Sequence, residues 1–424
     1  MSIDAVKLAQ ENEVLTIEQR RHIHRHPELS GQEFETLKYI RSRLDTYGVS
    51  YVEVEDGGIL GFLGDENKGR TLILRADIDA LPIVENPRNL KRERTVISEN
   101  PGIQHACGHD AHAAMLLTAA KILRENESKL RGRVILFFER GEEGTGNIRQ
   151  LLKYIEEKEI HIDAAHGIHV DALTPAGKFI ALGGPNHAGA CAFHVTLIGE
   201  GGHGSRPDLS ANPIDAFAGV YNALNSIRLK YISPFEQLTF SVGQISSGTR
   251  ANVIPGKLEF SGTLRFYNQV VAKRFVEEFR NILEHETAAC HCTYETEGFS
   301  LGLPLINNDK ITELIQGAVG RIFSANRLIM DANPSMGSES FSLLAKLYPS
   351  AMIYLGVRNE EFGSGAAHHS EYFDLDEAAL HDGVAETIAF AFDFLNYGGE
   401  IPFKQEVANL KELLALRAPL TMGK

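Results

Sequence analysis

The chain has 424 residues and a formal net charge of −14, with 42 basic and 56 acidic side chains spread along it without long blocks. This acidic balance argues against nucleic acid or an anionic membrane surface as a partner, and no apolar run reaches the roughly 20 residues that cross a bilayer. A chain of this length exceeds one ordinary hydrophobic core and predicts two domains.

The first part of the chain alternates strand-like and helical patterns. After an N-terminal helix come a strand at residues 71–76, a helix at 113–123, a strand at 133–138 and a helix at 148–155. This alternation predicts an α/β domain with a mostly parallel sheet covered by helices. We expect its first part to cover residues 1–186.

A break at Gly183-Gly184-Pro185 opens a second pattern. Its elements are a strand at 192–198, a helix at 213–228, strands at 238–245 and 257–266, a helix at 271–286 and a closing strand. This order predicts a small α+β domain of the ferredoxin-like type, inserted over residues 187–301. The patterns of the first domain then resume at 311–323, 352–355 and 377–395, so residues 302–424 complete it.

The segment from His105 to His112 concentrates four metal-capable side chains in eight residues. Cys107 and His109 lie two residues apart, so a thiolate and an imidazole can reach one cation from a single turn of backbone. Apolar residues with helical spacing follow. We interpret the segment as ligands at the start of a buried helix, although an inert core thiol fits this segment alone equally well.

Further donors follow other apolar runs. Glu142 and Glu143 come after the run at 134–138, and neighbouring side chains at a strand end point to opposite sides, so one could bind metal while the other moves protons. The pairs His166/His169 and His368/His369 also follow apolar stretches. Donors at successive strand ends are typical of sites in open α/β sheets.

Longer motifs occur in order along nearly the whole chain: residues 21–30, 74–82, 201–205, 252–255, 262–265, 337–341 and 369–373, together with the Cys107/His109 segment. In this the chain resembles the M20 metallopeptidase family, specifically the aminoacylase and amidohydrolase branch that includes hippurate and auxin-conjugate hydrolases. The resemblance implies a zinc-peptidase-like catalytic domain with an inserted lid and dimerisation domain.

The resemblance also implies roles for particular residues. Two divalent metal ions, zinc or manganese with cobalt and nickel as further alternatives, would be bound by Cys107, His109, Glu143, His169 and His369. A thiolate donor favours these metals over magnesium. Glu142 would be the general base, and Asp79 a carboxylate that orients a ligand.

Three residues of the inserted domain have implied roles as well. His203 would stabilise the oxyanion of the tetrahedral intermediate, often in the partner subunit's site, whereas by itself it could simply close a glycine-flanked turn. Asn252 and Arg265 would hold the substrate's carboxylate, whereas Arg265 alone could be a surface strand residue. We expect a homodimer through this domain, with a tetramer as the larger alternative.

The expected reaction is hydrolysis of the amide bond of an N-acyl amino acid, which releases a carboxylic acid and a free amino acid. The alternative is a dipeptidase or carboxypeptidase that uses the same two-metal site. A binding protein that has lost catalysis is a third class, but the presence of Glu142 and of all five ligands argues against it.

The chain departs from the family pattern in three places. Glu139-Arg140-Gly141 precedes the glutamate pair where Gln-Pro-Ala is usual, Asp208 stands at a usual histidine, and Glu371 at a common proline. We expect these changes to put extra charge beside the site and to alter acyl or amino acid preference.

Two smaller expectations concern histidines and cysteines. His22, His24 and His26 lie in a helical pattern that ends before Pro27, so we expect them to be structural. Four cysteines fit a reducing compartment better than a disulfide framework, and no signal peptide is visible at the N-terminus. We therefore expect a cytoplasmic protein.

Overall fold

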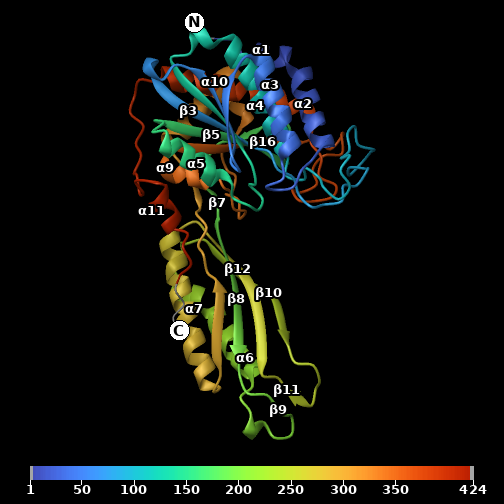
Figure 1. Ribbon diagram of the computed structural model, residues 1–424, viewed down its shortest axis with the longest axis vertical. Helices are drawn as coiled ribbons and strands as arrows, with labels where there is room; N and C mark the ends of the chain where they lie inside the picture. Colours follow the sequence, from blue (N-terminus) through green and yellow to red (C-terminus); the bar gives the residue numbers. More distant parts are fainter. Residues whose placement is uncertain (1–2, 421–424) are drawn as a thin grey trace. The chain divides into compact units, whose positions relative to one another are not determined.

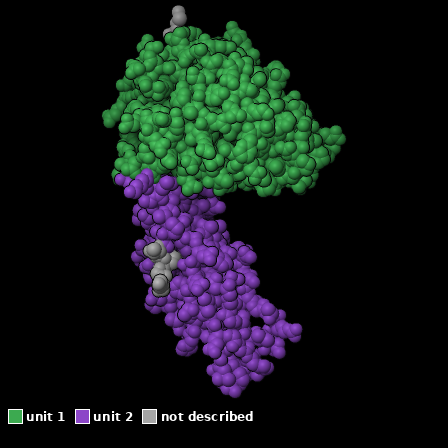
Figure 2. Space-filling view, viewed as in Figure 1, with its two compact units in different colours: residues 1–184, 307–333, 343–410 green, residues 185–306, 334–342, 411–424 purple. Residues whose placement is uncertain are grey.

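The computed structural model describes residues 3–420, which group into two compact units (Figure 2). Within these residues, unit 1 consists of 3–184, 307–333 and 343–410, and unit 2 of 185–306, 334–342 and 411–420. Four segments that the sequence analysis assigns to the first domain, 185–186, 302–306, 334–342 and 411–420, thus pack with unit 2. The division into functional domains stays a prediction.

Unit 1 is built on an eight-stranded sheet, whose strands can be followed in Figure 1. In spatial order its strands are β1 (Ser50–Val54), β2 (Gly58–Gly64), β4 (Gly132–Glu139), β3 (Arg70–Asp77), β5 (Ala164–Pro175), β16 (Ser350–Arg358), β6 (Phe179–Ile180) and β15 (Leu328–Ile329). The central pairs β4–β3, β3–β5 and β5–β16 are parallel, whereas β1–β2 and β2–β4 are antiparallel. The carboxyl ends of four neighbouring strands therefore meet along one edge.

Helices cover this sheet because their apolar faces pack on it. They are α1 (Ala5–Glu11), α2 (Glu13–Arg25), α3 (Phe34–Tyr47), α4 (His109–Glu125), α5 (Ile148–Glu157), α8 (Asp309–Ile322), α9 (Ser342–Leu347) and α10 (Leu380–Asn396). Helices α4 and α10 pack against each other and against β3. Both are buried over most of their length, which explains why apolar residues occur on all their sides.

Unit 2 has a four-stranded antiparallel sheet in the order β10 (Leu238–Ser247), β12 (Lys257–Phe266), β8 (Gly189–Ile198) and β13 (Thr293–Gly298). Helices α6 (Pro213–Lys230) and α7 (Gln269–Ala289) pack together and on this sheet. Chain order and sheet order confirm the predicted ferredoxin-like arrangement. Two short strands, β9 (Gly202–His203) and β11 (Val253–Ile254), pair beyond the end of β8.

The smaller elements of unit 2 and the C-terminal segment complete the described chain. Strands β7 (Gly184–His187) and β14 (Leu305–Asn307) form a two-stranded sheet, and α11 (Leu410–Ala415) lies near the C-terminus. The four cysteines are free, as expected. Among the described residues, no helix is both long and apolar enough to cross a membrane.

The predicted elements are found, with ends shifted by a few residues. The antiparallel strands β1 and β2 were not predicted. Strand β2 is buried on both faces and therefore lacks the apolar–polar alternation that marks a half-buried strand.

Candidate metal centre

The predicted ligands lie on four segments of unit 1 that follow or belong to neighbouring parallel strands. Cys107 and His109 end the long connection from β3 and begin α4, and His169 belongs to β5. Glu143 lies in the turn after β4, and His369 in the connection after β16. The fold thus brings together side chains that are up to 262 residues apart, counted from Cys107 to His369 (369 − 107).

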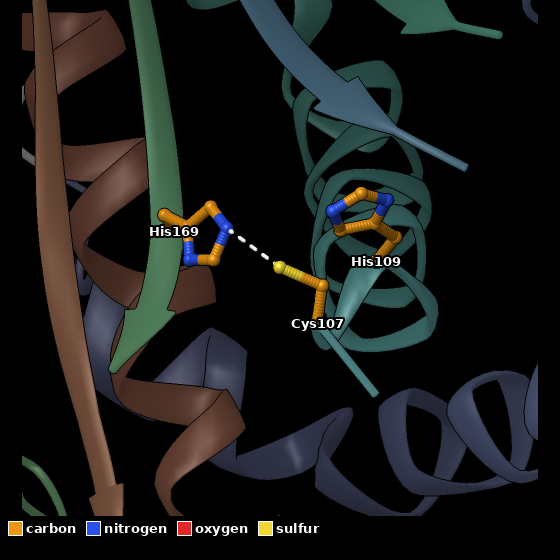
Figure 3. A group of neighbouring side chains, drawn as sticks. All are labelled: Cys107, His109 and His169. Carbon is orange, nitrogen blue, oxygen red and sulfur yellow. Dashed lines mark hydrogen bonds between the residues drawn. The ribbon is translucent and has the colours of Figure 1, made fainter. Parts of the chain in front are cut away.

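The first group of donors consists of Cys107, His109 and His169, whose donor atoms all lie within 4.8 Å of one another. The Cys107 Sγ atom is 3.6 Å from His169 Nε2. Figure 3 shows the thiol extending from the start of α4 toward the His169 ring on β5, with the His109 ring on the other side of the sulfur. One thiolate and two imidazoles in this arrangement suit a zinc-like cation.

A second group shares the same sulfur. The donor atoms of Cys107, Glu143 and His369 also lie within 4.8 Å of one another. Glu143 Oε1 is 3.1 Å from His369 Nε2 and 3.9 Å from His109 Nε2, so it lies between the two groups. Two overlapping groups that share Cys107 are suited to a pair of neighbouring cations.

The charges and unpaired atoms of this site fit positive ions. The Nε2 atom of His109 is buried and has no hydrogen-bond partner among the described residues. Burial raises the pKa of the Cys107 thiol, so a thiolate forms there only beside a compensating positive charge. Burial opposes ionisation of Glu143 as well, yet its hydrogen bond from His369 and the charge of His109 lower its pKa.

Asp79 connects two of the proposed ligands. Its Oδ1 atom is 3.1 Å from His109 Nδ1, and its Oδ2 atom accepts a 2.9 Å hydrogen bond from the Glu143 backbone N–H. The Ser30 hydroxyl also donates to Oδ2. This placement leaves His109 Nε2 without a hydrogen bond, 3.5 Å from Asp77 Oδ2, and it suits a carboxylate that orients ligands.

A second carboxylate–histidine pair, which the sequence analysis missed, lies next to His109. His112 Nδ1 is 2.6 Å from Asp77 Oδ1, while His112 Nε2 accepts a 2.9 Å hydrogen bond from the Val170 backbone N–H. Both nitrogens of His112 are thus engaged, and we expect it to support the site without binding metal. The available signal was the helical spacing of His109 and His112, which puts both on one face of α4.

Glu142 and Glu143 differ from the expectation that they point to opposite sides. They lie in a turn, three and four residues beyond the end of β4, and an oxygen of each is within 4.8 Å of a His109 nitrogen. The strand rule does not apply in a turn, so both carboxylates face His109. This proximity is compatible with one carboxylate as ligand and the other as base.

The extra charges of Glu139 and Arg140 are directed into the protein. Glu139 is fully buried and pairs with Arg75 at 2.8 Å. Arg140 Nε is 2.9 Å from Glu33 Oε2, and Arg140 Nη2 donates to the Gly31 carbonyl. Both residues thus have buried partners of opposite charge, and Arg75 also pairs with Asp77 at 2.8 Å. The expected effect of these residues on substrate preference stays a prediction.

The other two residues that depart from the family pattern, Asp208 and Glu371, also have hydrogen-bond partners nearby. Asp208 is exposed and accepts two hydrogen bonds from Arg206, at 2.8 and 2.7 Å. The Glu371 carboxylate accepts a 3.2 Å hydrogen bond from Asn86 Nδ2. Glu371 therefore joins two loops of unit 1.

His203, Asn252 and Arg265 lie in unit 2, and the structure separates them into two places. His203 on β9 pairs with Val253, next to Asn252, beyond the end of β8. Arg265 pairs with Ala190 at the beginning of β8. At about 3.3 Å per residue, β8 puts roughly 25 Å between these places within one unit 2. The expectation that Asn252 and Arg265 hold the substrate's carboxylate stays a prediction.

The local contacts of His203 define its tautomer. Its Nδ1 atom accepts a 3.1 Å hydrogen bond from the Ser205 backbone N–H, and the Ser205 hydroxyl is 2.7 Å from the same atom. A neutral ring that accepts at Nδ1 carries its proton on Nε2. His203 can therefore donate a hydrogen bond through Nε2.

Comparison with known proteins covers both units. A model of the peptidase family M20/M25/M40 matches residues 73–391. Thermostable carboxypeptidase 1 of Saccharolobus solfataricus is 33% identical over 389 residues, which cover 90% of this chain and 95% of that protein. N-acetyl-L-cysteine deacetylase of Bacillus subtilis is 33% identical over 364 residues, which cover 85% of this chain and 83% of that protein.

A solved structure has the same architecture. The YXEP protein of Bacillus subtilis, described as a dinuclear metal-binding peptidase of the M20 family, matches with a TM-score of 0.76 and 26% sequence identity. The match covers 91% of this chain and 99% of that chain. The α/β sheet and the separate antiparallel sheet are therefore both features of that architecture.

Proposed function

The chain belongs to the peptidase family M20/M25/M40, as its motifs predict, and on that premise we propose that it hydrolyses the amide bond of N-acyl amino acids. Family membership makes it a metal-dependent hydrolase. The observation that carries the proposal is the convergence of two donor groups on the shared Cys107 sulfur. The similarity to an N-acetyl-L-cysteine deacetylase supports an N-acyl amino acid as the substrate class.

The proposed cofactor is a pair of divalent metal ions, zinc or manganese. The donor set of one thiolate, three imidazoles and one carboxylate suits these metals, and cobalt or nickel, better than magnesium. Its members are Cys107, His109, His169, His369 and Glu143. Bound there, two such ions would supply the acidity that lets water lose a proton near neutral pH.

Glu142 is the proposed general base. Its carboxylate lies beside Glu143 and His109, and its side chain is half-buried, so it can reach both the site and the substrate. Glu142 would accept a proton from the attacking water and deliver it to the departing amide nitrogen. Asp79 would keep His109 and Glu143 in place during these transfers.

We propose that catalysis also requires a second copy of the chain. Arg265 would hold the substrate's carboxylate and His203 would donate through Nε2 to the oxyanion. Because roughly 25 Å of strand β8 separates these residues within one chain, they cannot both act on one small substrate from the same unit 2. A homodimer through unit 2 would supply His203 and Asn252 from the partner.

A peptidase is the second candidate, favoured by one observation. The relative from Saccharolobus solfataricus is named a carboxypeptidase and is as similar to this chain as the deacetylase is. A dipeptide or C-terminal peptide bond differs from an N-acyl amino acid only on the acyl side. The same metal centre and the same Arg265 would serve both substrates.

The deciding experiment is hydrolysis of a mixed substrate panel by the purified protein. The panel contains N-acetyl and N-benzoyl amino acids and dipeptides, with added manganese or zinc, and is repeated with chelator. Chelator-sensitive release of free amino acids from N-acyl substrates supports the proposal. Cleavage of dipeptides alone moves the assignment to a peptidase, and no cleavage by fully metal-loaded protein contradicts both.

A further inference from the structure

His369 lies on a segment without regular secondary structure. No helix or strand occurs between the end of β16 at Arg358 and the short 3-10 helix η5 (Glu377–Ala379). The His369 side chain is 52% exposed, and its backbone has a φ of 63°, a left-handed conformation that is uncommon for residues other than glycine. Other contacts must therefore hold this ligand in place.

One buried side chain, Arg94, makes two of these contacts. Arg94 is 8% exposed and belongs to the long connection between β3 and α4. Its guanidinium donates to three backbone carbonyls, those of Asn86 at 2.7 Å, Phe373 at 2.6 Å and Glu371 at 2.9 Å. Two of these carbonyls lie within four residues of His369.

Neighbouring residues of the same connection add bonds to the His369 segment. The Asn86 backbone N–H donates to the Glu371 carbonyl at 3.2 Å, and Gln104 Nε2 donates to the Phe373 carbonyl at 3.3 Å. The His369 backbone N–H itself donates to the Ala106 carbonyl at 2.9 Å, directly beside Cys107. The connection and the His369 segment are thus joined along their length, with Arg94 at the centre.

Arg94 is in turn anchored to the helices by buried charges. Its Nη1 atom is 3.3 Å from Glu85 Oε1, which is 2.8 Å from His24 Nε2. The other nitrogen of His24 is 2.8 Å from Asp110, the residue after the proposed ligand His109. His24 is therefore a structural residue of α2, as expected, and it links Arg94 to the start of α4.

We propose that Arg94 is a positioning residue for the half of the metal centre that contains His369, and that one of the two ions depends on it. This inference rests on the proposed two-metal site. Only arginine fits the task, because its planar guanidinium presents several donors in a fixed fork. Lysine would keep the charge that Glu85 requires but would not span three carbonyls.

The test measures metal binding by the full-length protein. Metal-free wild type, Arg94→Lys, Arg94→Gln and His369→Ala are titrated with manganese(II) by calorimetry, and bound metal is checked by elemental analysis. We expect wild type to bind two ions, and each Arg94 variant to bind one of them about 10- to 100-fold more weakly with the other unchanged. Arg88→Gln is the matched control, because Arg88 is an exposed residue of the same connection.

A double variant separates positioning from general damage. If Arg94 acts through His369, adding Arg94→Lys to His369→Ala causes no further loss of metal affinity. Two ions bound with wild-type affinity in both Arg94 variants, or an equal weakening of both ions, would overturn the inference. Arg94→Lys keeps a positive charge beside Glu85 and Asp374. It therefore remains available for the test if Arg94→Gln does not fold. Fewer than two ions in the wild type would contradict the proposed metal centre instead.

Discussion

The candidate residues of the two units differ in how firmly the protein itself holds them. In unit 1, His109 and Asp79 are each 1% exposed and bonded to each other, and Asp79 also holds the Glu143 backbone. In unit 2, His203 is exposed and is held by Ser205, two residues away, while the side chain of Arg265 makes a long 3.4 Å hydrogen bond to Ser338.

This difference corresponds to two roles: the residues of unit 1 hold the metal donors in place beforehand, and those of unit 2 complete the site once the substrate is bound. A metal centre must hold its donors before the ions bind, because ligand geometry determines affinity. Residues that contact only the substrate or a transient negative charge can remain exposed until the substrate or a partner subunit arrives. We therefore expect changes to the metal-holding residues of unit 1 to alter metal content, and changes to His203 or Arg265 in unit 2 to alter turnover and substrate affinity with the metal content unchanged.

The largest expected effect is that of Glu142→Gln. The amide keeps the shape of the side chain but cannot accept a proton, so turnover should fall by about 10²–10⁴-fold. Metal content measured by elemental analysis should stay at the wild-type level. Glu157→Gln, on the exposed face of α5, is the control, and near-normal turnover of the Glu142 variant would mean that another group is the base.

Cys107→Ala removes the donor that the two groups share. We expect the loss of about one metal ion per chain and of most activity, because a thiolate ligand contributes strongly to binding. Elemental analysis after dialysis measures the loss. Cys191→Ala, a thiol in the core of unit 2, should keep full metal content, and full content in the Cys107 variant would restore the inert-thiol interpretation.

His203→Ala tests unit 2 directly. Turnover should fall about a hundredfold, as expected for one oxyanion donor, while both ions remain bound. If His203 serves the partner's site, a mixture of His203→Ala and Glu142→Gln chains should regain activity, because a mixed dimer contains one intact site. Activity that stays unrestored after verified subunit exchange would place His203 in its own chain's site.

Arg265→Lys should act mainly on substrate affinity. A charge-assisted hydrogen bond contributes about 1.5–3 kcal/mol, so we expect KM to rise about tenfold or more with a smaller change in kcat. Steady-state kinetics on the best N-acyl substrate measures both. A substrate amide without a carboxylate should show no difference between the variant and wild type, and an equal rise in KM there would exclude carboxylate binding.

The last comparison concerns stability and sets one buried ion pair against one exposed ion pair, which has the smallest expected effect. Arg140→Met leaves the Glu33 carboxylate buried without its partner, and breaking such a pair costs about 3–5 kcal/mol of unfolding free energy. Asp208→Asn breaks the exposed pair with Arg206, and we expect no measurable change in stability. Chemical denaturation of both variants tests the contrast, and equal stabilities would refute it.

Much of this site is predictable from sequence because its parts are local. Cys107 and His109 are two residues apart, and the apolar spacing after them indicates the buried helix that α4 proves to be. The placement of donors after strands β4 and β16 follows from the alternation of strands and helices. The roles of the individual residues, including Glu142 and His203, stay predictions.

Other features depend on contacts between distant segments. No spacing in the sequence indicates that Glu139 pairs with Arg75, that Arg140 pairs with Glu33, or that Arg94 binds the segment of His369. These pairs form because folding buries their charges, and a buried charge is stable only beside a partner that the surrounding elements bring to it.

The sequence by itself indicated the family through its ordered motifs, and the order of the elements and the presence of metal-capable side chains after the strands through periodicity and short-range spacing. Only the tertiary structure decided which charges face the site and which are neutralised inside, and how an exposed loop holds His369. Those outcomes depend on which segments meet in space. Arg94, for example, donates to the carbonyls of Glu371 and Phe373, which are more than 270 residues away from it in the sequence.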